Sequence, residues 1–239
     1  MEERTHGIVL RRVRYSDTGM IVDIFTASRG TVSFLVKGGR GGRTRTNVLA
    51  PLAIVEVGFR WRQQRALQSL DDMHTAIPCP SLATDPVKMA VGMFLQEFLY
   101  HALKHEVASP PLYRYLAEGL VWLDRATDGL ANFHLAFTIG LTQYLGLWPS
   151  TEDWHEGAIF DLKEGCMADQ VPAHRFWLQA GDAARIPQIT RMTFRSMRLF
   201  KMSRTQRNAI LDVVTAYYRL HVPDFPELKS VEVLREIYQ

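Results

Sequence analysis

Cysteine is scarce in this chain of 239 residues, which holds only Cys79 and Cys166. Two thiols cannot build a disulfide framework, and they cannot supply a four-cysteine zinc site. Because stable disulfides belong to oxidising compartments, their absence favours a cytoplasmic location. The acidic start, MEERTHG, lacks the apolar run of a signal peptide and therefore gives no indication of export.

Long apolar runs are also scarce. One stretch, Gly129–Thr151, contains no Asp, Glu, Lys or Arg and is long enough in principle to span a bilayer. An asparagine, a histidine and a glutamine interrupt it, however, and its large side chains follow a helical stripe: Phe133, Phe137, Leu141 and Tyr144. We therefore expect a buried core helix and no membrane contact.

Signatures of catalysis are missing as well. The chain contains no P-loop, no G-x-G-x-x-G dinucleotide motif, no G-x-S-x-G and no HExxH. Glu97, His101 and His105 lie four residues apart and could ligate a metal, but half-exposed helical positions explain them more simply. Neither cysteine lies in a recognisable nucleophile motif. The sequence therefore predicts a protein that is not an enzyme and that holds no cofactor and no metal.

Charge is present but unevenly distributed. The formal net charge is only +3. Arg4–Leu70 holds twelve basic and three acidic residues, Asp85–Asp182 six basic and thirteen acidic, and Ala183–Arg219 eight basic and one acidic. Two basic blocks thus flank an acidic one. A polyanion-binding surface requires such segregation, although solvated faces produce weaker versions of it.

Short runs rich in Val, Ile, Phe and Leu, separated by turn residues, fill the first 80 residues. These runs predict five strands: Gly7–Arg14, Met20–Thr26, Thr31–Lys37, Leu52–Phe59 and Ala66–Leu70. Five short strands in about 70 residues suit a small closed or partly open barrel, of which the five-stranded OB-fold is the leading example. We therefore expect an OB-fold nucleic-acid-binding domain over residues 1–80.

Helical patterns dominate residues 81–239. Asp85 and Ser109 each precede a proline and are typical of helix N-caps, and Ser203 with Gln206 forms a capping box. Apolar residues three and four apart follow each of these starts. The sequence therefore predicts a two-domain β + α protein, with an all-helical C-terminal domain after the barrel.

A glycine-rich basic loop, VKGGRGGRTRTN, joins the third predicted strand to the fourth. Its spacing fits no nucleotide motif, but its arginines suit contacts with phosphate. A solvated surface turn is the alternative interpretation. The candidate DNA-binding residues of this loop are Lys37, Arg40, Arg43 and Arg45.

A second basic loop, GFRWRQQRA, lies between the fourth and fifth predicted strands. Arginines beside an aromatic ring are typical of single-stranded nucleic-acid binding, because guanidinium groups follow the backbone while the ring stacks on a base. In OB-folds the loops between strands one and two and between strands four and five commonly have this role. A hairpin tip with an accidental tryptophan is the alternative. The candidates are Arg60, Trp61, Arg62 and Arg65.

Two segments resemble the RecO family of recombination mediators. Gly7–Arg40 is similar to the N-terminal signature of the family, with a Tyr-containing turn, an "FT…G" element and a "KG" strand end in order. Leu220–Tyr238 is similar to the C-terminal ending of one branch and includes Leu228–Ser230. The resemblance implies an OB-fold followed by a helical domain. It also implies binding of single- and double-stranded DNA, strand annealing, and loading of RecA onto DNA covered by single-stranded-DNA-binding protein, with RecR as partner.

One departure from the family concerns zinc. Many members carry a four-cysteine module after a "G-x-x-P" turn such as Gly146–Pro149, but residues 149–175 offer only Cys166 among carboxylates and histidines. Structural zinc sites prefer thiolate and imidazole ligands. We therefore expect a metal-free insertion that contains a short hairpin through Ile159–Met167. A mixed His, Cys and carboxylate site is the alternative.

The last unusual stretch is Thr190–Arg207, where arginines three and four apart predict one basic helical face. The family resemblance implies a ligand for such a face, the acidic tail of single-stranded-DNA-binding protein. Arginine clusters recognise acidic motifs, and Phe194, Met197, Leu199 and Phe200 could form an apolar pocket beside them. A second DNA surface or a solvated face are alternatives. The candidates are Arg191, Arg195, Arg198, Lys201, Arg204 and Arg207.

These observations together predict a cytoplasmic, non-enzymatic mediator of DNA repair. Two other classes stay open at this point. The acidic segment could hold Mg²⁺ for a nuclease-like enzyme. The chain could also be a protein-interaction adaptor whose basic regions never contact DNA.

Overall fold

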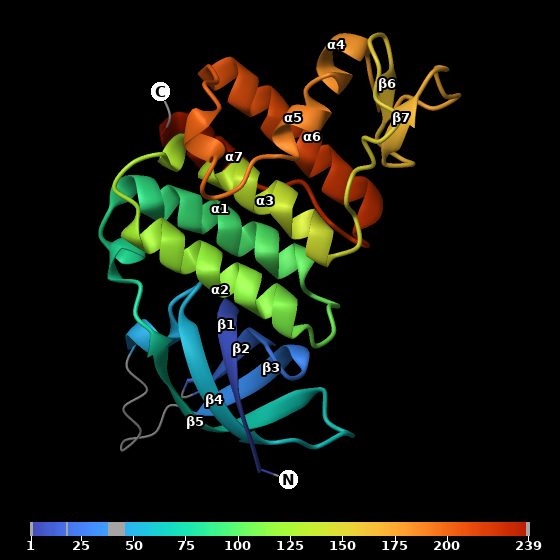
Figure 1. Cartoon of the computed structure of the whole chain (residues 1–239). Helices are drawn as coiled ribbons and strands as arrows, with labels where there is room; N and C mark the ends of the chain where they lie inside the picture. Colours follow the sequence, from blue (N-terminus) through green and yellow to red (C-terminus); the bar gives the residue numbers. More distant parts are fainter. Residues whose placement is uncertain (1, 18, 38–45, 238–239) are drawn as a thin grey trace. The chain divides into compact units, whose positions relative to one another are not determined.

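The structure is a computed structural model of the chain, and it describes residues 2–17, 19–37 and 46–237 (Figure 1). Contacts divide the chain into two compact units. The first unit extends to Arg125 and includes the returning segment Leu228–Ile237, whereas the second comprises Ala126–Glu227. Each unit therefore has its own set of elements.

The first unit contains a closed barrel of five strands in the order β1-β2-β3-β5-β4. Strands β3 and β5 pair in parallel, and the other neighbours are antiparallel. This arrangement is the OB-fold that the sequence predicts. The 3-10 helix η1 (Thr46–Leu49) precedes β4. The strands are β1 (Glu2–Arg14), β2 (Gly19–Thr26), β3 (Gly30–Lys37), β4 (Ile54–Arg60) and β5 (Leu67–Ile77).

Alternating apolar residues of the strands fill the barrel, as the two-residue period of a strand requires. Val9, Ile24 and Val57 are fully buried. The rings of Phe34 and Phe59 pack edge to face with their centroids 5.0 Å apart. Strands β1 and β5 are longer than predicted. Their additional residues are mostly polar and exposed or half exposed, so that no clear apolar pattern marks them in the sequence.

Three helices and one short turn complete the first unit: α1 (Pro86–Ala102), α2 (Pro110–Arg125), α7 (Ser230–Ile237) and η2 (Pro80–Ala83). The predicted N-caps are confirmed. The Asp85 carboxylate accepts hydrogen bonds from the amides of Val87 and Lys88, and the Ser109 hydroxyl accepts one from Leu112. Strand gives way to helix near residue 80 as expected, but the compact unit continues to Arg125.

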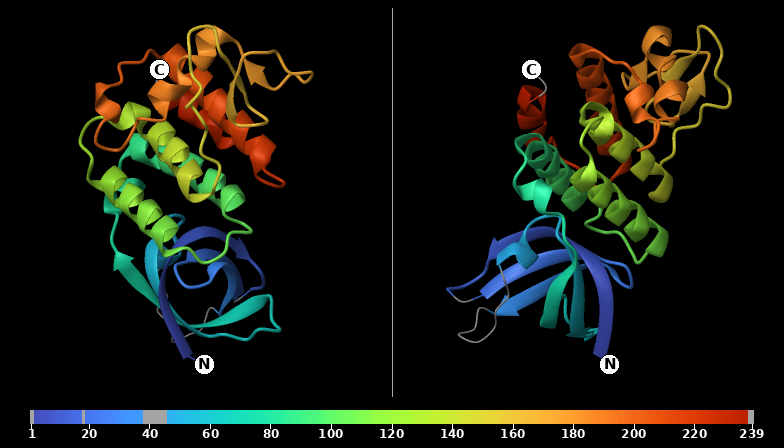
Figure 2. Two further views of the ribbon diagram at one scale, coloured as in Figure 1. Left: turned by 45° about the vertical axis from the view of Figure 1, so that its right-hand side comes forward. Right: turned by 60° about the vertical axis from the view of Figure 1, so that its left-hand side comes forward.

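The turn between β2 and β3 is fixed against the end of α1 (Figure 2). Thr31 donates its amide to the carbonyl of Glu106 at 3.2 Å and its hydroxyl to the carbonyl of Leu103 at 2.6 Å. Gly30 has a φ of +72°, and a β-carbon there would collide with the Glu106 carbonyl. Only glycine therefore permits this close approach.

The second unit combines helices with a small three-stranded sheet of order β7-β6-β8. The predicted core helix is confirmed as α3, in which Phe133, Phe137 and Leu141 are fully buried. The predicted hairpin is confirmed as the antiparallel pair of β6 and β7. The elements are η3 (Leu130–Asn132), α3 (Phe133–Tyr144), β6 (Ile159–Asp161), β7 (Cys166–Ala168), β8 (Trp177–Leu178), α4 (Ala180–Ala183), α5 (Ile186–Ile189), η4 (Met197–Leu199) and α6 (Arg204–His221).

One prediction for the second unit is wrong: the basic stretch before α6 is not a continuous helix. Helix α5 ends at Ile189, and only the 3-10 turn η4 follows before α6 begins at Arg204. Thr193 and Ser196 bond to each other's amides and hydroxyls, and these local hydrogen bonds compete with helical ones. The expected helical face of arginines therefore does not exist. The capping box at Ser203 is confirmed.

Among the residues that the structure describes, no helix has the length and apolar character that a bilayer span requires.

Candidate nucleic-acid interface

The loop between β4 and β5 is held in shape by one buried side chain, Gln68. Its amide oxygen accepts from the Arg62 amide at 3.0 Å, and its amide nitrogen donates to the carbonyls of Arg62 and Arg65. Gln68 is only 1% exposed, whereas both arginine side chains are exposed. The loop therefore has a fixed backbone and presents two guanidinium groups to solvent. Sequence reasoning missed Gln68, because a lone glutamine in a strand carries no motif.

The arginines of this loop have few anionic partners. Arg60 lies 3.8 Å from Asp71, but its side chain is 71% exposed, so that this pair is weak. Arg62 and Arg65 form no ion pair with any residue in the described part of the chain. Their charges are thus available for an external anion.

Three other arginines of the barrel have partners within the first unit. Arg4 lies 3.4 Å from Asp72, Arg14 lies 3.4 Å from Asp17, and Arg11 donates to the Tyr100 hydroxyl at 2.5 Å. The positive balance counted along the sequence therefore overstates the charge that a ligand would meet. Arg62 and Arg65 differ from Arg4 and Arg14 because no carboxylate among the described residues pairs with them.

Trp61 is half buried, whereas its sequence context suggests a ring whose face is open to solvent. Its ring packs edge to face on Phe59, with 6.3 Å between centroids, and it contacts the barrel core. The guanidinium carbon of Arg29 lies 4.8 Å from the ring centroid. One face of the indole is therefore covered by a cation that the sequence analysis did not select. The sequence does not reveal this contact because Arg29 and Trp61 are far apart along the chain.

The glycine-rich loop cannot be placed in the same way. Arg40, Arg43 and Arg45 lie outside the described residues. Lys37 is the last residue of β3, where its backbone pairs with Gly19 of β2. The role of these four residues in DNA binding stays a prediction.

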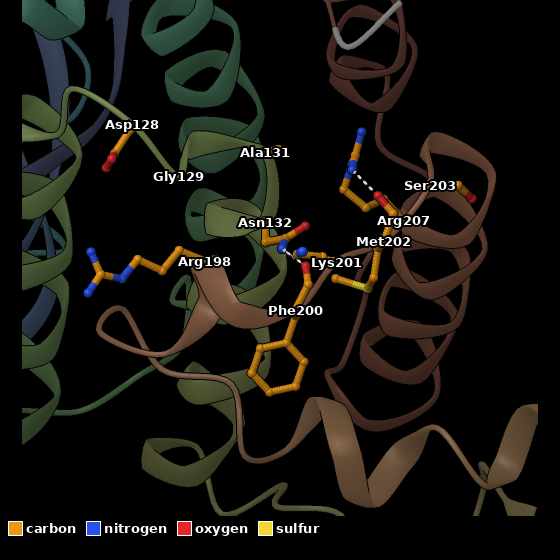
Figure 3. A pocket seen from close by; sticks show the side chains of 10 residues that line it. All are labelled: Asp128, Gly129, Ala131, Asn132, Arg198, Phe200, Lys201, Met202, Ser203 and Arg207. Carbon is orange, nitrogen blue, oxygen red and sulfur yellow. Dashed lines mark hydrogen bonds between the residues drawn. The ribbon is translucent and has the colours of Figure 1, made fainter.

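The second unit contains a pocket of about 570 Å³ beside the start of α6 (Figure 3). Arg198, Lys201 and Arg207 line it together with a single carboxylate, that of Asp128. Phe200 and Met202 add apolar surface. The pocket thus combines an excess of positive charge with an aromatic ring.

Asn132 shapes this pocket by fixing the segment before α6 (Figure 3). Its amide nitrogen donates to the carbonyls of Met197 at 2.9 Å and Phe200 at 2.8 Å. Arg207 donates to the carbonyl of Met202 at 2.6 Å. Two side chains therefore hold a stretch whose own backbone forms only the short 3-10 turn η4.

The six predicted partner-binding residues separate into two groups. Arg198, Lys201 and Arg207 meet at the pocket, whereas Arg191, Arg195 and Arg204 are not among its lining residues. The expected apolar neighbours also separate. Phe194 stacks on Phe133 with 5.5 Å between centroids, and Met197 is 1% exposed, so both belong to the core. Phe200 alone of the four lines the pocket.

A smaller hollow of about 260 Å³ adjoins this pocket. Phe200, Lys201 and Met202 line both, and Arg185 and Gln206 belong to the smaller one. Residues 200–202 therefore border both hollows.

Within the described part of the chain, no group of three or more His, Cys, Asp or Glu side chains is arranged to hold a metal ion. In the insertion, His155 pairs with Asp169 at 2.7 Å and His174 with the buried Asp161 at 3.3 Å. Glu97, considered above as a ligand, accepts hydrogen bonds from the start of α7.

Comparison with known proteins places these features in a family. Models named "Recombination protein O N terminal" and "Recombination protein O C terminal" match residues 1–77 and 83–231. A DNA repair protein RecO of Phocaeicola vulgatus is 40% identical over 240 residues, covering 100% of both chains. Proteins of the same name from Bacteroides fragilis and Porphyromonas gingivalis are 38% and 31% identical, covering 100% and 98% of both chains. The chain therefore belongs to the RecO family of DNA repair proteins.

Proposed function

We propose that this chain is a recombination mediator that binds DNA through its barrel. The observation that carries the proposal is the β4–β5 loop, where Arg62 and Arg65 project from a backbone fixed by the buried Gln68. Unpaired guanidinium groups on a fixed backbone suit phosphate oxygens, and phosphate contact depends little on sequence. Such a surface serves a protein that must act on any DNA. Both single- and double-stranded DNA offer these phosphates.

The mediator role requires further activities. In this proposal the chain anneals complementary strands and, together with RecR, helps RecA to load onto DNA coated by single-stranded-DNA-binding protein. Family membership supports these steps, and we assign no residue to RecR or RecA. The cytoplasm, where these partners act on DNA, is the proposed location. No catalytic motif in the sequence points to an enzyme.

The pocket beside α6 is the proposed site for the acidic C-terminal tail of single-stranded-DNA-binding protein. Arg198 and Lys201 form no ion pair with a described residue and are exposed. Carboxylates would pair with these cations, while Phe200 and the 73% exposed Leu199 would contact apolar side chains of the tail. An extended peptide could occupy both hollows, because residues 200–202 border both.

Two assays test this proposal. Fluorescence polarisation with a labelled single-stranded oligonucleotide measures DNA binding, and loss of binding as salt increases is the expected behaviour. Annealing of complementary strands is then followed with and without single-stranded-DNA-binding protein. Absence of DNA binding would favour an adaptor, and conversion of the DNA to shorter fragments with Mg²⁺ would favour a nuclease.

A further inference from the structure

Arg29 and Trp61 come from two separate loops at one end of the barrel. Arg29 lies in the turn between β2 and β3, and Trp61 directly follows β4. The guanidinium carbon lies over the indole, 4.8 Å from its centroid, which is within the range of a cation–π contact. Closure of the barrel therefore builds a two-layer structure from residues that are far apart in sequence.

Glu3 of β1 fixes the orientation of the Arg29 guanidinium, which lies over the indole. Its carboxylate accepts from the Arg29 Nη2 at 2.9 Å and from Nε at 3.1 Å, so that one edge of the guanidinium is held by a fork of hydrogen bonds. The Ser28 hydroxyl donates to the same carboxylate at 2.6 Å. This fork leaves the plane of Arg29 with little freedom to rotate.

The backbone beneath Arg29 is fixed as well. The Arg29 amide donates to the hydroxyl of Thr26 at 3.1 Å, and Thr26 is fully buried. Gly30 brings the next residues against the carbonyl of Glu106, where no β-carbon fits. The stack is therefore organised before any ligand binds, which lowers the entropy lost on binding.

We propose that Arg29, supported by Trp61, is the stacking surface for one unpaired nucleobase. This inference rests on the proposed DNA binding by the barrel and adds residues to that site. The Arg29 side chain is 41% exposed although its guanidinium carbon lies over the indole. In this proposal the face turned away from the indole receives the base. Bases stack on arginine planes as they do on aromatic rings. The base thus becomes the third layer of the stack.

The charge around Arg29 favours a base over an anion as its ligand. Glu3 already neutralises Arg29 and occupies one edge of its fork, so a phosphate or a carboxylate would meet a compensated charge. A neutral π-system needs only the open face. Arg62 and Arg65, which lack such a partner, are the groups left for the adjoining phosphates.

Substitution of Arg29 tests the platform. Binding is measured by fluorescence polarisation with an oligothymidine of about 15 nucleotides, near the upper site size of an OB-fold. Loss of one base stack corresponds to about tenfold weaker binding for Arg29→Ala. The dependence on salt should change little because stacking releases no counterions and Glu3 already compensates the charge of Arg29. Arg29→Lys, which keeps the charge but not the plane, should bind as weakly as Arg29→Ala.

Two comparisons separate stacking from electrostatics. With an abasic oligonucleotide of the same length, Arg29→Ala should lose much less affinity than with oligothymidine, because no base is present to stack and only the loss of one charge remains. Glu3→Gln removes a negative charge, which by itself would strengthen DNA binding. The platform predicts the opposite, several-fold weaker binding, because Arg29 loses its fixed plane.

Arg114→Ala, which removes an exposed arginine from α2, is the matched control and should bind like the unmodified protein. Thermal melts show that each variant is folded. The platform is overturned if Arg29→Ala keeps full affinity, if it weakens the abasic ligand equally, or if Glu3→Gln binds more tightly. If the unmodified protein fails to bind oligothymidine, the proposed DNA binding falls with it.

Discussion

The carboxylate of Glu97 in α1 caps the start of α7 through Ser230. It accepts hydrogen bonds from the Ser230 hydroxyl at 2.5 Å and amide at 2.8 Å, and from the Lys229 amide at 3.1 Å. Amide groups in the first turn of a helix have no partner inside the helix, so that an external carboxylate replaces the usual N-cap side chain. Glu97 thereby attaches the returning C-terminal segment to the first unit.

We therefore expect Glu97→Ala to lower the free energy of unfolding by about 1 kcal/mol, the usual cost of removing a helix cap. Chemical denaturation measures this loss, and amide exchange should show faster opening of Ser230–Ile237. Glu118→Ala, on the exposed side of α2, is the control and should change neither quantity. Equal exchange of α7 in Glu97→Ala and the unmodified protein would refute the capping role.

The same contact makes the stability of the fold decrease in acid. Burial by itself would raise the pKa of Glu97, but hydrogen bonds from Ser230 and Lys229 outweigh it and hold the pKa below 4.5. The folded state therefore resists protonation more than the unfolded state does. The stabilisation is complete above the pKa of the unfolded state and is lost as the pH falls through the pKa of the folded state.

Local patterns were sufficient to predict much of the fold. The five strands, the caps at Asp85 and Ser109 and the capping box at Ser203 each depend on neighbours within a few residues. The resemblance at Leu228–Ser230 was noticed as a motif, but its cause, the carboxylate of Glu97, lies more than a hundred residues earlier. Sequence order does not show such long-range partners.

The candidate sites show the same limit. The position of the loop after β4 was predicted, whereas Gln68 beneath it and Arg29 above Trp61 were not, because closure of the barrel creates both contacts. The arginine stripe before α6 was predicted from helical spacing alone. Hydrogen bonds between Thr193 and Ser196 replace that helix.

Removal of the two loop arginines should change the salt dependence of DNA binding. When the logarithm of the binding constant is plotted against the logarithm of salt concentration, each phosphate contact with single-stranded DNA contributes about 0.7 to the slope. The double variant Arg62→Ala with Arg65→Ala should therefore lower the slope by about 1.4. Polarisation titrations at several salt concentrations measure it. Trp61→Phe, which keeps an aromatic support for Arg29, should leave the slope unchanged. A double variant with the original slope would place the phosphate contacts elsewhere.

Charge reversal at the pocket should weaken binding of an acidic peptide without affecting DNA binding by the barrel. Each charge-assisted hydrogen bond contributes about 1.5–3 kcal/mol, so Arg198→Glu or Lys201→Glu should weaken the peptide about tenfold or more. Arg191→Glu and Arg195→Glu carry the same charge change outside the pocket and serve as controls. Calorimetry with an acidic tail peptide measures affinity. Equal losses from all four variants would indicate a diffuse basic surface rather than this pocket.

His134 should make the second unit sensitive to mild acid. Burial and, to a smaller extent, the positive charge of Arg207 lower the pKa of His134 to about 3. Between pH 6.5 and this value the unfolded state holds a proton that the folded state excludes, so stability falls as pH falls, by about 1.4 kcal/mol for each pH unit. Above pH 6.5 the contribution is complete.

His134→Leu fills a similar volume without a titratable group, so its stability should vary less with pH between 6.5 and 4.5. Denaturant titrations across this window measure the slope for both proteins. His101→Gln is the matched control, because burial also lowers the pKa of His101 but its side chain is only half buried. We expect the His101 variant to keep most of the acid sensitivity of the unmodified protein. If His134→Leu loses stability with acid as steeply as the unmodified protein, His134 is not the group that titrates.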